Sequence, residues 1–261
     1  MLIAIDIGNT TITIGVFEGD ALTVHSIGTH PLRSAMEYKA ELVAMAMSVN
    51  GVASDNGRVA DAVVVASVVP AVSDRVVEAA SMISRTSPFV INHLAVREMS
   101  LDLVEPARLG ADRIAESYAA MRLCGAPVAV IDFGTATTVN FVGRGNIYKG
   151  GAIMPGLGLM LSSMYMGTAA LPEVRLKDIP QALGKDTEAN MLSGIIFGSA
   201  GAVRNIIEEV EAAEGETYKV AVTGGHMDLM LPYLKRKDLA ERHLALYGLK
   251  FIYEERQSAR A

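Results

Sequence analysis

The chain has 261 residues, enough for one and a half to two domains of ordinary size that bury a core without disulfides or structural metals. Its 23 Lys and Arg residues against 29 Asp and Glu give a formal net charge of −6, which argues against sequence-independent nucleic-acid binding. Its one cysteine, Cys124, excludes an internal disulfide, so a secreted disulfide scaffold is ruled out and a cytoplasmic location is expected.

The first half of the chain alternates predicted strands and helices. Apolar and β-branched residues predict strands at 2–5, 11–17, 21–27, 62–69 and 88–91. Helical spacing of apolar residues predicts helices at 36–48, 73–84 and 112–123. A polar loop is expected at 50–58 and an irregular connection at 101–108.

The pattern restarts in the second half. Strands are predicted at 128–131, 136–142, 147–154 and 219–222, and helices at 156–166, 187–213 and 243–255, before a frayed tail at 257–261. The longest stretch without a charge, 150–172, is interrupted by Gly, Pro and Ser. It therefore predicts a strand, a Pro-Gly turn and a buried helix, and no membrane is expected as a partner.

A repeat at half the length of the chain is the most informative feature. The sequence Ala-Ile-Asp-Ile-Gly-Asn-Thr-Thr at 4–11 aligns with Val-Ile-Asp-Phe-Gly-Thr-Ala-Thr at 130–137, an offset of 126 residues. Both segments read as a strand that ends in Asp, a Gly turn with hydroxyl or amide residues, and a second strand. The repeat predicts a duplicated domain.

Each of these turns suits the binding of a phosphate. The glycine lets backbone N–H groups approach phosphate oxygens, and the aspartates, Asp6 and Asp132, are suited to hold Mg²⁺ through water. A single hairpin of this kind is explained as well by an Asp that satisfies turn amides, but the pair favours phosphate binding. A third glycine turn, Thr-Gly-Gly at 223–225, follows a strand as nucleotide-binding turns do.

The motif set resembles the type III pantothenate kinases, within the acetate and sugar kinase, heat-shock protein and actin superfamily. The shared motifs are Asp-Ile-Gly-Asn-Thr at 6–10, Gly-Ala-Asp-Arg at 110–113, Asp-Phe-Gly-Thr-Ala-Thr-Thr at 132–138, Gly-Gly-Ala-Ile-Met-Pro-Gly at 150–156, Thr-Ala-Ala-Leu-Pro at 168–172, Gly-Lys-Asp-Thr at 184–187 and Thr-Gly-Gly at 223–225. They occur in the order and spacing of the family and cover essentially the whole chain.

The resemblance implies an α/β fold of two duplicated ribonuclease H-like, actin-like domains around a nucleotide cleft. The expected domains are 1–111 and 112–255, with a tail at 256–261. It also implies an ATP-dependent kinase that converts pantothenate to 4′-phosphopantothenate, the first step of coenzyme A biosynthesis. Its expected cofactors are ATP, Mg²⁺ and a monovalent cation, K⁺ or NH₄⁺, and its expected assembly is a homodimer.

The resemblance also assigns roles to individual residues. Asp112 is expected to be the catalytic base, although it also suits the N-cap of the helix that it opens. The expected phosphate- and nucleotide-binding residues are Asp6, Gly8, Asn9, Thr10, Gly134, Thr135, Thr137, Gly224 and Gly225. Asp6 and Asp132 are the expected metal ligands, and Gly110, Arg113, Leu103 and Thr187 the expected acceptor-site residues, with Thr187 reaching the partner subunit's site.

Two departures from the family pattern concern the acceptor and the cation. Leu103 stands where the family usually has a tyrosine that lines the pantothenate site. Asn140 stands where an aspartate is usual, which is expected to weaken a cation site. Two alternatives therefore stay open: a paralogous kinase for another small hydroxylated substrate, and an inactive nucleotide-binding regulator. The retained Asp112 argues against the regulator, because a binding module needs no base.

Overall fold

The computed structural model describes residues 1–50, 58–178 and 181–259, and divides into two compact units. Unit 1 comprises Met1–Glu98, Val104–Ala119 and Leu244–Ala261, and unit 2 comprises Met99–Leu103 and Ala120–His243. In the described part of the chain, no helix is both long and apolar enough to cross a membrane.

Unit 1 is built on a five-stranded sheet with the order β3-β2-β1-β4-β5. Its strands are β1 (Leu2–Ile7), β2 (Thr11–Glu18), β3 (Ala21–Gly28), β4 (Ala62–Ser67) and β5 (Phe89–Val90). The first three form an antiparallel meander, and β4 and β5 continue the sheet in parallel with β1. The apolar run predicted at 62–69 is the fully buried strand β4, as its lack of alternation indicates.

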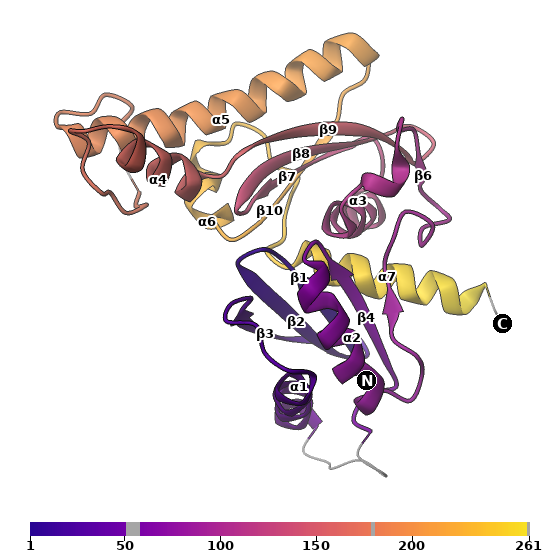
Figure 1. Cartoon of the computed structure of the whole chain (residues 1–261). Helices are drawn as coiled ribbons and strands as arrows, with labels where there is room; N and C mark the ends of the chain where they lie inside the picture. The colour runs from indigo at the N-terminus through magenta and orange to yellow at the C-terminus, as the bar shows by residue number, and fades with distance from the viewer. Residues whose placement is uncertain (51–57, 179–180, 260–261) are drawn as a thin grey trace. The chain divides into compact units, whose positions relative to one another are not determined.

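Helices cover both faces of this sheet (Figure 1). They are α1 (Ala35–Asn50), α2 (Pro70–Ile83) and α7 (Leu244–Ser258), and the first part of α3 (Ala111–Cys124) contacts α7. Ile3, Ile5 and Ile7 pack with α1 and α2 on one face, and α7 packs against β1 and β4. A Cβ atom on Gly248 of α7 would lie 2.8 Å from Ala115 Cα of α3, so this helix crossing requires a glycine.

Unit 2 repeats the topology of unit 1. Its strands are β7 (Val128–Phe133), β8 (Ala136–Gly143), β9 (Ile147–Pro155), β10 (Lys219–Thr223), β11 (Leu239–Ala240) and the edge strand β6 (Ser100–Leu101). The order is β11-β10-β7-β8-β9-β6, with β7–β8–β9 antiparallel and β10 and β11 parallel to β7. Apart from β6, it is the order of unit 1, which confirms the predicted α/β fold with a duplicated architecture.

One face of this second sheet is covered by α4 (Leu157–Gly167), α5 (Thr187–Glu214) and the short α6 (Met227–Met230) (Figure 1). The described residues also form 3₁₀ helices at Pro106–Arg108 and Leu231–Tyr233. The uncharged stretch 150–172 forms the end of β9, a turn and α4, as predicted, but the expectation of a buried helix was wrong, because only Leu157 and Leu161 of α4 are buried. Its apolar residues serve the core, where Leu157 and Leu161 are buried.

The structure departs from the sequence predictions in few places. The short elements β6, α6 and β11 were not predicted, and α7 continues to Ser258 where a frayed tail was expected. The compact units also divide the chain differently from the expected bounds 1–111 and 112–255, because α7 belongs to unit 1 and α3 passes between the units after Ala119. Most of the loop expected at 50–58 lies outside the described residues.

Candidate phosphate-binding hairpins and catalytic carboxylate

The first Asp-Gly turn joins β1 to β2 at the end of a buried strand. The Gly8 N–H donates to Thr11 O at 3.0 Å, which closes a tight turn with Asn9 and Thr10 exposed at its tip. The fully buried Thr29 holds the turn from behind: its Oγ1 donates to Gly8 O at 2.7 Å, and its N–H donates to Thr10 O at 3.0 Å. The tip is thus exposed to solvent on a turn held by these hydrogen bonds.

The second turn, between β7 and β8, is one residue shorter than the first. Ile7 pairs with Ile12 across the first hairpin, whereas Phe133 pairs with Thr137 across the second. Equivalent residues of the two repeats therefore differ in number by 126 before the turn and by 125 after it. As a result, Asp6 lies opposite Thr13 and Asp132 lies opposite Thr138.

This register places the neighbouring residues Thr137 and Thr138 on opposite faces of the sheet. Thr137 shares a strand face with Val139 and Phe141 of the apolar core, is fully buried, and its Oγ1 has no hydrogen-bond partner among the described residues. Thr138 instead shares the face of Asp132 and is 8% exposed. Sequence reasoning selected Thr137, whereas the strand pairing shows that Thr138, like Thr13 in the first hairpin, lies on the face of the aspartate.

Asn140 lies on the same face as Thr138, further along β8. It is fully buried, its Oδ1 accepts a hydrogen bond from the Tyr148 hydroxyl at 2.8 Å, and its Nδ2 donates to Thr138 Oγ1 at 3.1 Å. The residue that replaces the family's aspartate is thus part of a hydrogen-bonded chain that ends beside Asp132. Because Thr138 Oγ1 accepts from Asn140, its own hydroxyl proton is available to a different acceptor.

Two further glycine turns pack against the second hairpin. A Cβ atom on Gly156 would lie 2.5 Å from Gly134 O, and the Gly156 N–H donates to Thr135 O at 3.1 Å. Gly224 has a φ of +98°, and its Cβ would lie 2.6 Å from both N and C of Phe133. The structure therefore brings Gly134, Thr135 and Gly224 together, and side chains are excluded where these backbones meet.

Gly225 differs from its neighbour Gly224. Nothing lies within 4 Å of the position that its Cβ would occupy, so this residue faces open space. The following backbone is anchored to the hairpin, since the His226 N–H donates to Phe133 O at 3.0 Å.

Asp112 is the second residue of α3, not its N-cap. Its Oδ1 accepts a hydrogen bond from the Arg113 N–H at 2.7 Å, and burial of the side chain raises its pKa above the usual 3.8. The Arg113 N–H bond and the Arg113 charge oppose that rise in pKa without cancelling it. A mostly buried carboxylate with a raised pKa is suited to accept a proton near neutral pH.

The start of α3 lies at the same edge of unit 1 as the first hairpin. A Cβ atom on Gly110 would contact Asp112 Oδ1 and would lie 3.6 Å from Val68 Cγ1. The N–H of Val68 in turn donates to Ile7 O at 3.1 Å, directly before Gly8. Unit 1 thus carries a phosphate-binding type of turn and a buried carboxylate at one end of its sheet.

The other expected acceptor-site residues lie in unit 2. The half-buried Leu103 lies beside Gly150 of β9, where a Cβ atom on the glycine would lie 3.7 Å from Leu103 Cδ2. Thr187 is the exposed first residue of α5, and Asp186 caps that helix by accepting a hydrogen bond from the Ala189 N–H at 2.8 Å. The Gly-Lys-Asp-Thr motif therefore contains the N-cap and the first residue of α5.

The described residues contain no cluster of three or more His, Cys, Asp or Glu side chains that could bind a metal by themselves. Mg²⁺ does not require such a cluster, because it is commonly held by one or two carboxylates together with substrate phosphates and water. The carboxylates at the ends of β1 and β7 are hard oxygen donors of the required kind, so Asp6 and Asp132 fit this ion.

Comparison with known proteins gives consistent matches over nearly the whole chain. The family model for type III pantothenate kinase matches residues 2–209. A type III pantothenate kinase from Roseiflexus sp. (strain RS-1) is 36% identical over 259 residues, covering 99% of this chain and 100% of the relative. One from Moorella thermoacetica is 36% identical over 255 residues, covering 97% of this chain and 99% of the relative.

A solved structure supports the fold. The activator of 2-hydroxyisocaproyl-CoA dehydratase from Clostridium difficile, with bound ADPNP, aligns with a TM-score of 0.54 at 13% identity, covering 99% of this chain and 97% of the other. At this identity the similarity concerns the fold alone, which is the actin-like arrangement expected from the sequence.

The two glycines of the Thr-Gly-Gly turn give a matched test of the packing around the second hairpin. We expect Gly224→Ala to lower the free energy of unfolding by about 1–3 kcal/mol, because its Cβ collides with the Phe133 backbone at a left-handed φ. Gly225→Ala should stay within about 0.5 kcal/mol of the wild type. Urea unfolding measures both, and equal stabilities of the two variants would contradict the packing described.

Proposed function

The chain belongs to the type III pantothenate kinase family, and from that premise we propose how its residues carry out the reaction. The activity is the transfer of a phosphoryl group from ATP to pantothenate, which gives 4′-phosphopantothenate in the first step of coenzyme A biosynthesis. The matches over nearly the full length of chain and relatives carry this conclusion.

We assign the role of general base to Asp112. Phosphoryl transfer depends on positioning and charge neutralisation, with a carboxylate that orients the attacking hydroxyl and accepts its proton. Asp112 is mostly buried, is fixed by the Arg113 N–H and has a pKa raised by burial, which brings its basicity closer to the working pH. Gly110 and Arg113, which flank it at the start of α3, belong on this proposal to the acceptor side.

The two hairpins supply the phosphate contacts. Turn N–H groups around Gly8 and Gly134, with the side chains of Asn9, Thr10 and Thr135, donate to phosphate oxygens on this proposal, while Gly225 offers an open surface for the adenosine. Thr138, on the face of Asp132, joins this set in preference to the core-facing Thr137.

Asp6 and Asp132 are the proposed ligands of the cations. When bound, Mg²⁺ neutralises charge that develops on the phosphates, as in other kinases. A requirement for K⁺ or NH₄⁺ is proposed on the same basis. Asn140 contributes no carboxylate to either ion, and acts instead through its hydrogen bond to Thr138.

An assay of ADP release tests the activity. With pantothenate, Mg²⁺ and K⁺ present we expect ADP release that depends on pantothenate, and a panel of other small alcohols serves as the control for the substitution of Leu103 for tyrosine. Turnover with another alcohol and none with pantothenate would contradict pantothenate as the acceptor.

The variant Asp112→Asn separates catalysis from folding. Transfer should fall by about a hundredfold to ten-thousandfold, with nucleotide affinity retained, because the base is lost and the shape is kept. The melting temperature at neutral pH should not fall, since a neutral amide avoids the burial of a charge that raises the Asp112 pKa.

The stability of the wild type relative to Asp112→Asn should depend on pH in a defined direction. Because its folded-state pKa is raised, Asp112 binds its proton more tightly in the folded protein, and the wild type gains stability relative to the variant as the pH falls toward that pKa. The acidic limb of kcat/KM should lie above pH 3.8, the ordinary Asp value. Wild-type turnover in Asp112→Asn would remove this residue from the mechanism.

Thr138→Val and Thr137→Val form a second matched pair. Thr138→Val removes the hydrogen bond that the buried Asn140 Nδ2 donates to Thr138 Oγ1, so it should cost about 1–3 kcal/mol in unfolding free energy and raise the Mg²⁺ or K⁺ concentration needed for half-activity. Thr137→Val removes an oxygen that has no partner among the described residues and should leave both quantities unchanged or improved. The reverse ranking would place the functional hydroxyl on Thr137.

A homodimer is proposed through the outer face of α4. This helix carries no charged residue; Leu157 and Leu161 enter the core, while Leu159, Tyr165 and Met166 are 49%, 48% and 74% exposed. Leu159 and Met166 are seven residues apart and so share one stripe of the helix. An exposed apolar stripe of this kind marks a protein interface. Thr187 is proposed to act in the partner subunit's acceptor site.

Met166→Lys tests this interface. We expect the dimer dissociation constant to rise at least about tenfold, because a charge would have to be buried between subunits. Sedimentation equilibrium measures it, with Leu94→Lys as the control, since Leu94 is equally exposed, at 76%, and lies in unit 1. An unchanged dimer in Met166→Lys would place the interface elsewhere.

A further inference from the structure

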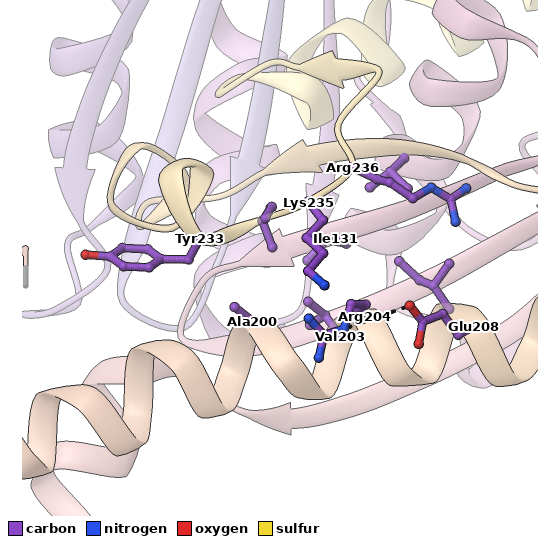
Figure 2. A pocket seen from close by; sticks show the side chains of 11 residues that line it. Ile131, Ala200, Val203, Arg204, Glu208, Tyr233, Lys235 and Arg236 are labelled. Carbon is purple, nitrogen blue, oxygen red and sulfur yellow. Dashed lines mark ion pairs between the residues drawn. The ribbon is translucent and has the colours of Figure 1, made fainter. Parts of the chain in front are cut away.

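A pocket of about 260 Å³ opens in unit 2, between α5 and the segment that follows α6 (Figure 2). None of the residues proposed to bind phosphate, metal or acceptor lines it. Its walls are mainly aliphatic, from β7, α5, β10 and the segment after α6: Ile131, Ala200, Val203, Ile207, Val220 and Leu234.

The pocket results from a difference between the two repeats. In unit 1 the strand β4 is followed by α2, a helix of 14 residues that packs on the sheet. The equivalent strand in unit 2, β10, is followed only by the four-residue α6 and a short 3₁₀ helix. Because α6 and the 3₁₀ helix are shorter than α2, an unfilled space remains among the aliphatic side chains of β7, β10 and α5.

Two cations face this space from opposite walls. Figure 2 shows the Lys235 side chain extending toward α5, where the Arg204 side chain lies. Lys235 has no hydrogen bond or ion pair within the described ranges of the chain, and Arg204 has only a long pair with Glu208, at 3.9 Å. The neighbouring Arg236 is neutralised by two bonds of 2.8 Å to Glu211. Glu208 also lines the pocket and offsets Arg204, so the charge of Lys235 leaves the mouth of this apolar pocket positive.

We propose that this pocket binds a small hydrophobic carboxylate, with the apolar body against Val203 and Ile207 and the carboxylate at Lys235 and Arg204. Charge complementarity selects an anion, and the aliphatic walls select an apolar body over a sugar or a phosphate ester. The volume lies just under the range of about 300–1,000 Å³ typical of drug-sized ligands, so a compact acid of roughly ten non-hydrogen atoms fits. The proposal is independent of the kinase reaction.

Octanoate and the uncharged 1-octanol, titrated calorimetrically into the full chain, test it. Octanoate should bind saturably with a dissociation constant in the micromolar to millimolar range, and Lys235→Gln should weaken it about tenfold without affecting octanol. Lys237→Gln is the control, because the Lys237 ammonium donates to Leu231 O and does not line the pocket. Equal octanoate affinities of the two lysine variants would overturn the proposal.

A pocket-filling variant locates the apolar part of the site. Ala200→Leu should weaken both octanoate and octanol, since the added atoms occupy the pocket, and a circular-dichroism melt confirms that the variant is folded. If that variant does not fold, the smaller change Val203→Ile serves the same purpose. The absence of saturable octanoate binding to the wild type, or octanoate binding unaffected in a folded pocket-filling variant, would also overturn the proposal.

Discussion

The close approach of three backbone segments around the second hairpin is the constraint on which its site depends. Gly224 lies against Phe133 and Gly156 against Gly134 and Thr135, at distances that exclude a Cβ atom. Backbone packed this closely cannot shift without breaking the hydrogen bonds from Gly156 and His226 to the hairpin. The first hairpin reaches the same rigidity by other means, through the buried Thr29. The same kind of Asp-Gly turn is thus held by backbone packing in the second half of the chain and by the Thr29 hydrogen bonds in the first half.

The elements that could be predicted from the sequence are those long enough to show a period. The strands of both meanders and helices such as α1, α2 and α5 follow from the spacing of apolar residues. The two-residue strands β6 and β11 and the four-residue α6 show no period, because they are held by their neighbours in space. The membership of α7 in unit 1 was equally hidden, since it depends on packing against β1 and β4, which are distant from α7 in the sequence.

In the candidate site, too, the strand pairing decides something that the sequence pattern alone does not show. The repeat at 6–11 and 132–137 identified the hairpins and their aspartates without an alignment of relatives. One residue fewer in the second turn then changes which residue lies opposite the aspartate, because neighbouring side chains on a strand point to opposite faces. The sequence Thr-Thr at 137–138 looks uniform, and only the pairing of β7 with β8 distinguishes a core threonine from one on the aspartate's face.

The charges of the two hairpins bear on which ions must be bound together with the proposed nucleotide. The hairpin segments 6–13 and 132–138 contain no Lys or Arg, and each brings an aspartate to the place proposed for phosphates. Backbone N–H groups supply only partial charges, which do not offset a carboxylate and the phosphates beside it. On the proposed function, the nucleotide therefore needs cations beside Asp6 or Asp132, so the proposed metal dependence follows from the residues of the turns. On the proposed mechanism Asp112 differs in kind from these two aspartates, because burial raises its pKa and the residue is assigned to proton transfer and not to cation binding.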